Sequence, residues 1–317
     1  MQDEAAGTAV VLRAPAKVNL GLKITGVRSD GYHEIQSIFA PINLYDEIVI
    51  APNLEGQRSR VNYFSPNNTP LNFENDTVTR ALHILSEAKI SVPVVDIKIT
   101  KKIPAGGGLG GGSSDAATVL KYLYEHFAPV ITDSQINYGL NSMALKIGSD
   151  VPFFLGRGAT LVWGIGEKLK PVKLESFAVL VSTPPFEVLT KDAYSWFDKE
   201  CELTHGAADA TTTMIDEALA TILASGVSGP YPRIIKMREI IEIMKNDLEK
   251  PVETRHPEIG ILKKALRQWG ALGSLMSGSG SSVYGVFRSL NDAVTAREKL
   301  QQQFPSTYAF FACETLI

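Results

Sequence analysis

Residues 103–115 read IPAGGGLGGGSSD, with six glycines among the seven positions 106–112. Because glycine has no Cβ, such a segment allows a ligand to approach the main chain closely. The segment leads into an amphipathic helix pattern, and the first amide groups of a helix have no partner within it and favour an anion. The stretch therefore predicts a phosphate-binding loop. A flexible or tight connection without a ligand is the alternative.

The sequence on either side of this segment predicts a strand before it and two helices after it. VDIKITKKI at 95–103 alternates strictly, as in a strand with one face in solvent. Apolar residues then recur at helical spacing in two stretches, Leu120 to Phe127 and Ile136 to Ile147. A further helix is expected over residues 76–88.

The remaining sequence predicts an α+β protein of two domains. The first hundred residues are rich in strand-forming residues, with a turn signal at Ser29-Asp30-Gly31 that predicts a hairpin. FAVLVST at 177–183 follows a polar stretch and predicts a new buried strand. Strand patterns return at 274–287 and 308–314. We expect a domain boundary near residue 170, which gives domains 1–170 and 171–317.

Composition restricts the class of protein. The chain has 317 residues, a net charge of −3 and 44% hydrophobic residues, which is typical of a globular protein and argues against a nucleic-acid partner. It shows neither a signal-peptide pattern nor an apolar run that could span a membrane, so a cytoplasmic location without a membrane partner is expected. Cys201 and Cys313 have no spacing that predicts a disulfide or a metal site.

Several phosphate-binding motifs can be compared with the glycine segment. A P-loop requires Gly-Lys-Ser/Thr, whereas Ser113 follows Gly112 directly. Gly106, Gly108 and Gly111 satisfy G-x-G-x-x-G, which keeps an NAD(P)-dependent oxidoreductase as an alternative. The half-solvated strand before the segment argues against that alternative, because strands of a parallel dinucleotide-binding sheet are buried on both faces.

Two further stretches accompany the glycine segment. APAKVNLGLKITG at 14–26, IPAGGGLGGGSSDAA at 103–117 and MSGSGSSVYGVF at 276–287 together resemble the three motifs of the GHMP kinases, the small-molecule kinases named for galactose, homoserine, mevalonate and phosphomevalonate. The resemblance covers most of the chain. It implies an N-terminal domain like ribosomal S5 domain 2 and a ferredoxin-like C-terminal domain, with ATP and a small alcohol as substrates.

RSDGYHEIQSIF at 28–39 and SDVPFF at 149–154 are similar to a branch of this family whose substrate carries a cytidyl group. The resemblance implies that Lys17 and Asp150 form the catalytic pair. It places four residues against the substrate, Asn19, Tyr32, His33 and, less directly, Tyr194. It assigns the ATP phosphates to the glycine segment, namely Pro104, Ala105, Gly106, Gly107, Gly108, Leu109, Gly110, Gly111, Gly112, Ser113 and Ser114.

Each of these assignments has a structural alternative. Lys17 could be a solvated strand lysine, Asp150 a turn cap, Tyr32 with His33 a cross-strand pair, and Tyr194 a core residue. Asp115 is a second candidate base, although an acid near a helix start is expected for the helix dipole alone. Mg²⁺ is expected with ATP, without an assigned protein ligand. Two further hypotheses are a GHMP kinase that acts on a different small alcohol and a non-catalytic binding protein of the same fold.

Overall fold

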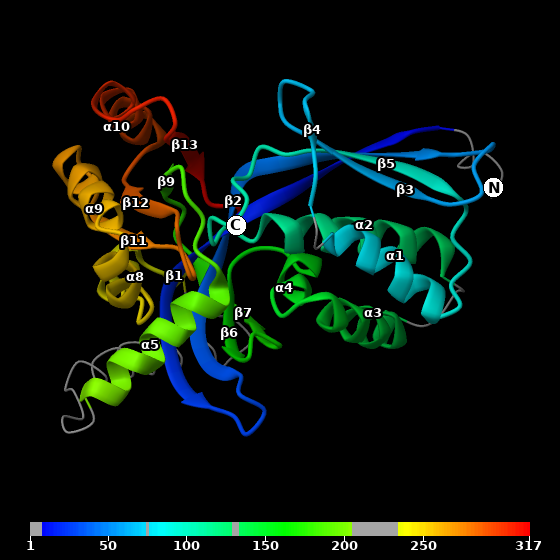
Figure 1. Ribbon diagram of the computed structural model, residues 1–317, viewed down its shortest axis with the longest axis horizontal. Helices are drawn as coiled ribbons and strands as arrows, with labels where there is room; N and C mark the ends of the chain where they lie inside the picture. The colour runs from blue at the N-terminus through cyan, green and yellow to red at the C-terminus, as the bar shows by residue number, and fades with distance from the viewer. Residues whose placement is uncertain (1–7, 74–75, 129–132, 205–233) are drawn as a thin grey trace. The chain divides into compact units, whose positions relative to one another are not determined.

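The computed structural model describes residues 8–73, 76–128, 133–204 and 234–317 (Figure 1). By its internal contacts the chain divides into two compact units. The first unit comprises Met1–Ala16, Leu44–Pro104 and Gly110–Gly156, and the second comprises Lys17–Asn43, Ala105–Leu109 and Arg157–Ile317. Each unit consists of several segments of the chain, which alternate along the sequence. The predicted boundary near residue 170 would divide the chain only once, and it stays a prediction.

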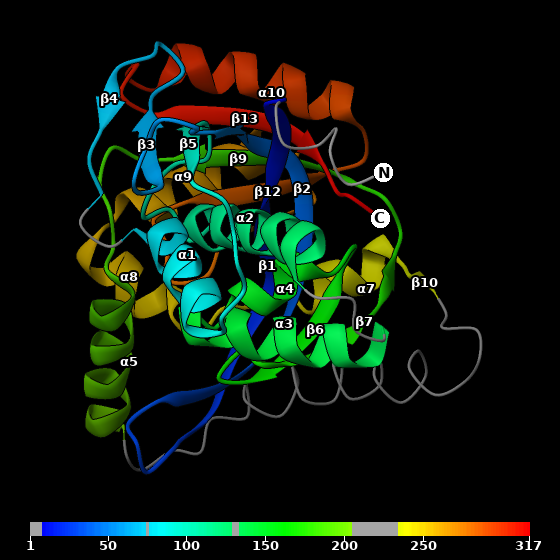
Figure 2. The same ribbon diagram turned by 90° about the vertical axis from the view of Figure 1, so that its right-hand side faces the viewer.

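The first unit combines strands with a group of helices. Parts of β1 (Val10–Val27) and β2 (His33–Pro52) belong to it. Its other elements are β3 (Arg60–Phe64), β4 (Pro70–Leu71), α1 (Thr77–Glu87), β5 (Val95–Thr100), α2 (Gly111–Phe127), α3 (Asp133–Ile147) and α4 (Val151–Leu155). Strand β5 pairs antiparallel with β2 and parallel with β3, which in turn pairs antiparallel with β4. The four helices lie together on one face of β3 and β5 (Figures 1 and 2).

The local predictions for this unit are confirmed. Helix α1 begins after Asp76, whose carboxylate accepts the amides of Val78 and Thr79 at 2.9 and 3.1 Å. Strand β5 buries Val95, Ile97 and Ile99 and leaves the intervening side chains at least partly exposed. It lies in a mixed sheet with one solvated face, unlike the buried parallel sheet of a dinucleotide-binding fold.

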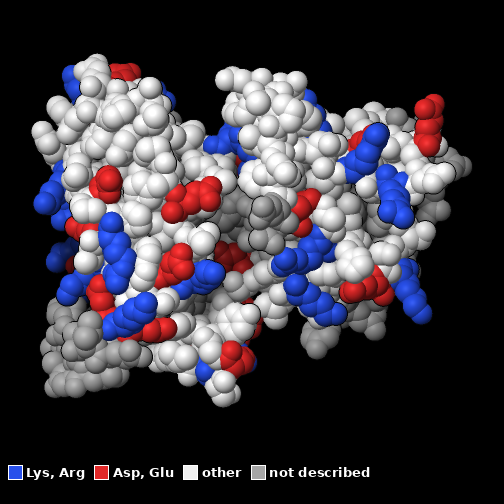
Figure 3. Space-filling model, viewed as in Figure 1, with Lys and Arg blue, Asp and Glu red and all other residues white. Residues whose placement is uncertain are grey.

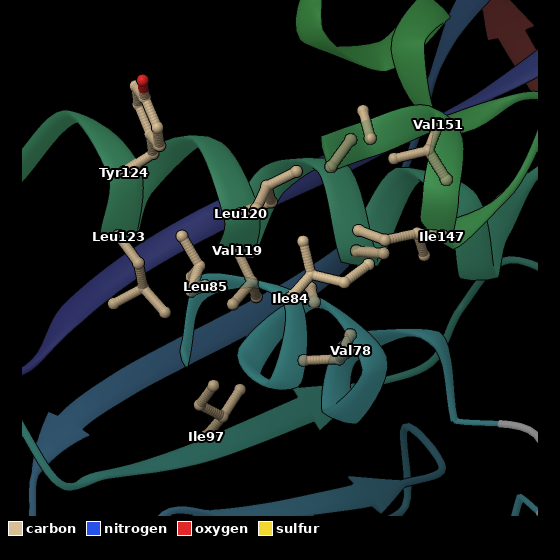
Figure 4. Close-up of a cluster of buried hydrophobic side chains, with 14 of the residues drawn as sticks. Val78, Ile84, Leu85, Ile97, Val119, Leu120, Leu123, Tyr124, Ile147 and Val151 are labelled. Atoms are coloured by element: carbon tan, nitrogen blue, oxygen red, sulfur yellow. The ribbon is translucent and has the colours of Figure 1, made fainter. Parts of the chain in front are cut away.

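The core of the first unit holds α2 in place. Side chains of α1 and β5, among them Val78, Ile84 and Ile97, pack with Val119 and Leu120 of α2 (Figure 4). Full burial of a side chain of this size contributes about 1.5–3 kcal/mol. The hydroxyl of Thr77 also donates to the carbonyl of Gly112 at 2.7 Å. The first turn of α2, where the glycine segment ends, is therefore fixed against the start of α1.

The second unit contains the β1–β2 turn and a separate four-stranded sheet. The turn at residues 28–32 joins two paired strands, which confirms the predicted hairpin. The strands that follow are β6 (Thr160–Gly164), β7 (Lys168–Pro171), β8 (Lys173–Leu174), β9 (Ala178–Thr183), β10 (Ile234–Ile235), β11 (Gly273–Met276), β12 (Val283–Phe287) and β13 (Ala309–Glu314). The helices are α5 (Thr190–Thr204), α7 (Met237–Glu242), α8 (Glu249–Arg255), α9 (Glu258–Gln268) and α10 (Leu290–Gln303).

The four-stranded sheet of the second unit has the order β11-β12-β9-β13, with all neighbours antiparallel. Every residue of β9 is buried, as FAVLVST predicted. Helices α9 and α10 pack on this sheet through a core that includes Leu266, Ala296 and Leu300 (Figure 1). The chain therefore has an α+β fold with two compact units, as predicted.

Candidate functional site

The glycine segment takes a backbone course that only glycine adopts easily. Gly106, Gly108 and Gly110 have φ angles of 61°, 70° and 73°, in the left-handed region that costs other residues about 1–2 kcal/mol. A methyl group on Gly108 would lie 2.1 Å from the carbonyl oxygen of Ser277. Two separate constraints, backbone angle and close contact, therefore require glycine at position 108.

In the first unit, the segment ends at the exposed start of α2. Gly110 is the N-cap residue and supplies no side-chain cap, so the first amides of the helix are not covered by a capping side chain. Ser113 is half-buried and Ser114 is fully buried. Amides of this kind, with the positive end of the helix dipole, suit an anion.

In the second unit, Lys17 is held beside the glycine segment. Its side chain is 3% exposed, so the alternative of a solvated strand lysine is wrong. The ammonium group donates to the side-chain oxygen of Asn19 at 2.5 Å and to the carbonyl of Gly108 at 3.0 Å. It also lies 4.7 Å from the centre of the Phe39 ring. The predicted residue Lys17 thus binds one peptide group of the segment and also the predicted residue Asn19.

The third motif packs against the same segment within the second unit. The hydroxyl of Ser277 donates to the carbonyl of Gly108 at 3.0 Å, and the amide of Ser282 donates to the carbonyl of Gly107 at 3.2 Å. The amide of Lys17 donates to the carbonyl of Leu109 at 2.9 Å. Parts of all three sequence motifs therefore meet at residues 107–109.

One residue of this arrangement was missed by the sequence analysis. Asn246 donates to the carbonyls of Met276 and Gly278, at 2.9 and 2.7 Å, and so fixes the start of the third motif. It lies in no recognisable motif between α7 and α8. Only the long-range fold brings it to the site, so no local sequence signal identifies it.

Asp150 lies in the first unit, immediately before α4. Its side chain makes no hydrogen bond that caps this helix. Its proposed partner Lys17 belongs to the second unit. The pairing of the two residues stays a prediction.

The predicted substrate residues His33 and Tyr194 lie together in the second unit. Their ring centres are 4.6 Å apart, and the Nε2 atom of His33 is 2.7 Å from a carboxylate oxygen of Asp198. Phe197 extends the group, with its ring 6.5 Å from that of His33. Tyr32, by contrast, is 62% exposed. Asp198 was missed, because a charged residue on a helix of mixed polarity has no distinguishing pattern.

Asp115 has a different environment from the one expected for a base facing the loop. It is fully buried, and the Lys101 ammonium donates to its carboxylate at 2.6 Å. Burial raises the pKa of Asp115 to about 7, the Lys101 charge opposes that rise, and the nearby Asp46 carboxylate adds to it. The interpretation of Asp115 as an acid placed for the helix dipole is therefore wrong, because Asp115 lies beyond the first turn of α2 and belongs to a buried ionic cluster.

Charges of both signs are interspersed on the face shown in Figure 3. Among the helices that the structure describes, none is long and apolar enough to cross a membrane. Within the same part of the chain, no group of three or more His, Cys, Asp or Glu side chains is placed to hold a metal ion.

Two family models match the chain, the GHMP kinases N terminal domain at residues 76–158 and the GHMP kinases C terminal region at residues 233–306. The first covers the helix that follows the glycine segment, and the second covers the third motif. A crystal structure of homoserine kinase from Cytophaga hutchinsonii is 18% identical with a TM-score of 0.67, and covers 98% of this chain and 95% of its own. That likeness is one of fold. The two family models indicate the class of the GHMP kinases.

Relatives of higher identity narrow the class. The 4-diphosphocytidyl-2-C-methyl-D-erythritol kinase of Syntrophomonas wolfei is 35% identical, over 94% of this chain and 96% of its own. The enzyme of that name from Geobacter sp. strain M21 is 36% identical, over 92% and 94%. A crystal structure of 4-(cytidine 5'-diphospho)-2C-methyl-D-erythritol kinase is 33% identical, with a TM-score of 0.70 over 97% and 100% of the two chains. The chain belongs to the family of 4-diphosphocytidyl-2-C-methyl-D-erythritol kinases within the GHMP kinases.

Proposed function

We propose that this protein transfers the γ-phosphoryl group of ATP to the 2-hydroxyl of 4-diphosphocytidyl-2-C-methyl-D-erythritol, a step in the non-mevalonate route to isoprenoid precursors. The observation that carries the proposal is the arrangement of Lys17, Asn19 and Ser277 around the glycine segment, in a chain whose relatives bear this activity in their names. A buried lysine bound to the carbonyl of Gly108, in a segment rich in glycine, suits a polyphosphate next to a reacting alcohol.

The nucleotide phosphates are assigned to residues Pro104 to Ser114. This assignment is supported by the glycines, which have no Cβ to keep a ligand away from the main chain, and by the start of α2. ATP supplies the transferred group. Mg²⁺ is assigned to the nucleotide, held by phosphates and water, because the described residues offer no cluster of three acids and Mg²⁺ in such sites keeps several waters. When bound, the ion neutralises phosphate charge.

The chemistry requires little from the protein beyond position and charge. A carboxylate is far too weak a base to remove the proton of an alcohol completely before transfer, because an alcohol is a very weak acid. We therefore assign Asp150 to orienting the hydroxyl and accepting its proton late in the transfer. We assign Lys17 to stabilising the negative charge on the transferred phosphoryl group. A preorganised cation is most effective for this purpose in a site without water.

The cytidyl end of the substrate is assigned to Tyr32, His33 and Tyr194. The rings of His33 and Tyr194 offer flat apolar surfaces, and Asp198 holds one ring nitrogen of His33. Exposed Tyr32 lies at the hairpin turn, where a side chain can move onto a ligand. Base stacking on aromatic rings contributes about 1–3 kcal/mol for each base.

A coupled assay of ADP release tests the proposal. The purified protein is incubated with MgATP and, separately, with the cytidyl substrate, homoserine and mevalonate. We expect turnover with the cytidyl substrate alone, with one ADP formed for each phosphorylated product. Turnover of a simple alcohol would indicate another GHMP kinase. Nucleotide binding without any turnover, or quenching of NAD(P)H fluorescence on binding, would contradict the proposal.

A further inference from the structure

A buried ionic cluster lies at the base of the glycine segment in the first unit. It consists of Asp46 on β2, Lys101 just after β5, and Asp115 on α2. The two aspartates are fully buried, and the side chain of Lys101 is 9% exposed. The Lys101 ammonium donates to both carboxylates. No step of the proposed reaction uses these three side chains.

Asp46 also binds the main chain at the entrance to the segment. Its second carboxylate oxygen accepts the amides of Lys102 and Ile103, at 2.5 and 2.9 Å. These residues directly precede Pro104, the first residue of the predicted phosphate loop. One side chain therefore fixes the direction in which the backbone leaves β5.

Lys101 connects this entrance to the far end of the segment. Its ammonium bridges Asp46 to Asp115, which lies in the early part of α2. A methyl group on Gly111 would lie 3.3 Å from the Lys101 nitrogen and 3.0 Å from the side chain of Ile103. Residues 101–103 and 111–115, which flank the glycine segment, are thus packed closely together. This packing also fixes the position of the amides at the start of α2.

The composition of the cluster indicates a role in geometry more than in stability. Two carboxylates share one ammonium group, so the buried cluster carries an excess of negative charge when all three ionise. One oxygen of Asp115 has no hydrogen-bond partner among the described residues. Buried ion pairs are weak contributors to stability, since desolvation offsets their attraction, and apolar residues of similar volume often stabilise as well or better. What apolar residues cannot do is bind two amides in one fixed direction.

We propose that Asp46 is a positioning residue for nucleotide binding, which sets the position of the α2 amides by tying the two flanks of the glycine segment together. The inference rests on the proposed function only in assigning the ATP phosphates to that segment. Asp46 itself need not contact the nucleotide, because it acts through the amides of Lys102 and Ile103 and through Lys101.

Two substitutions of Asp46 distinguish its role in positioning the backbone from the effect of its negative charge. Asp46→Asn retains a side-chain oxygen that can accept the two amides, whereas Asp46→Ala removes it. We expect Asp46→Ala to raise the Kd of MgATP about ten- to hundredfold, as misplacement of a binding group typically does. Asp46→Asn should restore part of the affinity, because it keeps the acceptor for the two amides although its amide nitrogen cannot accept from Lys101. The KM of the alcohol substrate should stay within about twofold in both variants.

The matched control is Asp96→Asn. Asp96 is also a β-sheet aspartate with an ion pair, to Arg60 at 2.6 Å, but it is exposed and lies away from the glycine segment. Its replacement should leave the Kd of MgATP unchanged. Binding is measured by titration calorimetry without the alcohol substrate, beside thermal unfolding of each variant. The nucleotide assay therefore remains informative even if the cytidyl substrate is not turned over.

Three results would overturn the inference. Asp46→Ala could bind MgATP as the parent does, Asp46→Asn could bind as poorly as Asp46→Ala, or the KM of the alcohol could rise as much as the Kd of MgATP. If Asp46→Ala does not fold, Asp46→Thr, which retains a side-chain oxygen without the charge, is compared with Asp46→Val of similar shape. The same loss of affinity in both would equally contradict positioning by an acceptor at this site.

Discussion

The ammonium of Lys17 and the hydroxyl of Ser277 each lie 3.0 Å from the same acceptor, the carbonyl oxygen of Gly108. Residues near opposite ends of the chain therefore fix one peptide of the glycine segment. The C=O and N–H of a trans peptide point in opposite directions, so this arrangement turns the amide of Leu109 away from both side chains. The direction of the Leu109 amide is thus set by two residues, Lys17 and Ser277, that lie in separate sequence motifs.

Gly108→Ala should disrupt this arrangement. The new methyl group would lie 2.1 Å from the carbonyl oxygen of Ser277, at a φ of 70°, so the segment must move. We expect MgATP affinity to fall at least about tenfold, since the binding amides move with the peptide. Gly31→Ala is the control, because Gly31 has a φ of 84° and no atom within 4 Å of the added methyl. That variant should lose about 1–2 kcal/mol of stability from backbone strain and keep its nucleotide affinity. Calorimetry and thermal unfolding distinguish the two, and equal affinities in both variants would contradict a structural need for glycine at 108.

Asp150→Asn should affect turnover far more than binding. The amide can still hydrogen-bond the alcohol but cannot accept its proton, so we expect kcat to fall about 10²- to 10⁴-fold while the KM of the cytidyl substrate changes little. Steady-state kinetics with saturating MgATP provide the measurement. Turnover close to that of the parent protein would remove Asp150 from the chemistry.

The periodic elements could be predicted from the sequence because each follows from a local pattern. Alternation identified β5, and a helix was expected over residues 76–88, where α1 lies. The glycine run identified the loop, since no common element needs so many residues without a Cβ. The contacts of Gly108 with Lys17 and Ser277 could not be predicted from the sequence, because contacts across such separations leave no periodic signal.

The ionic cluster was missed although the sequence carried a sign of it. In β2 the buried positions alternate through Leu44, Asp46 and Ile48, so Asp46 is a charged residue on the apolar face. Alternate residues of a strand face the core, so a charged residue at one of these positions indicates that it has a buried partner. The partner could not be identified in the same way, because Lys101 follows β5 and its direction depends on how the chain turns there.

Tyr194→Ala tests the cytidyl site. Loss of one stacking surface should weaken binding of the cytidyl substrate by about 1–3 kcal/mol, roughly five- to 150-fold, with the KM of ATP unchanged. Tyr308→Ala is a suitable control, because Tyr308 packs in a separate aromatic group with Phe304 and Phe310. Unaltered KM values for both substrates in Tyr194→Ala would show that Tyr194 serves only the core of the second unit.

The raised pKa of Asp115 predicts how stability changes with pH. The unfolded chain releases this proton near an ordinary carboxyl pKa of about 4, whereas the folded protein keeps it until its pKa of about 7. Between these values the folded state binds more protons than the unfolded state, so the contribution of Asp115 to stability is greatest at low pH and is lost as pH rises. The slope from one such group reaches about 1.4 kcal/mol per pH unit.

Asp115→Asn isolates this contribution from those of other titrating groups, because the amide stays neutral and can still accept a hydrogen bond from Lys101. Urea unfolding of both proteins at about pH 5, 6 and 7 gives the difference in unfolding free energy. We expect that difference to move in favour of the variant as pH rises, because only the parent must then bury a second carboxylate charge beside Asp46. A difference independent of pH would show that Asp115 is already ionised throughout, with Lys101 compensating fully for its burial.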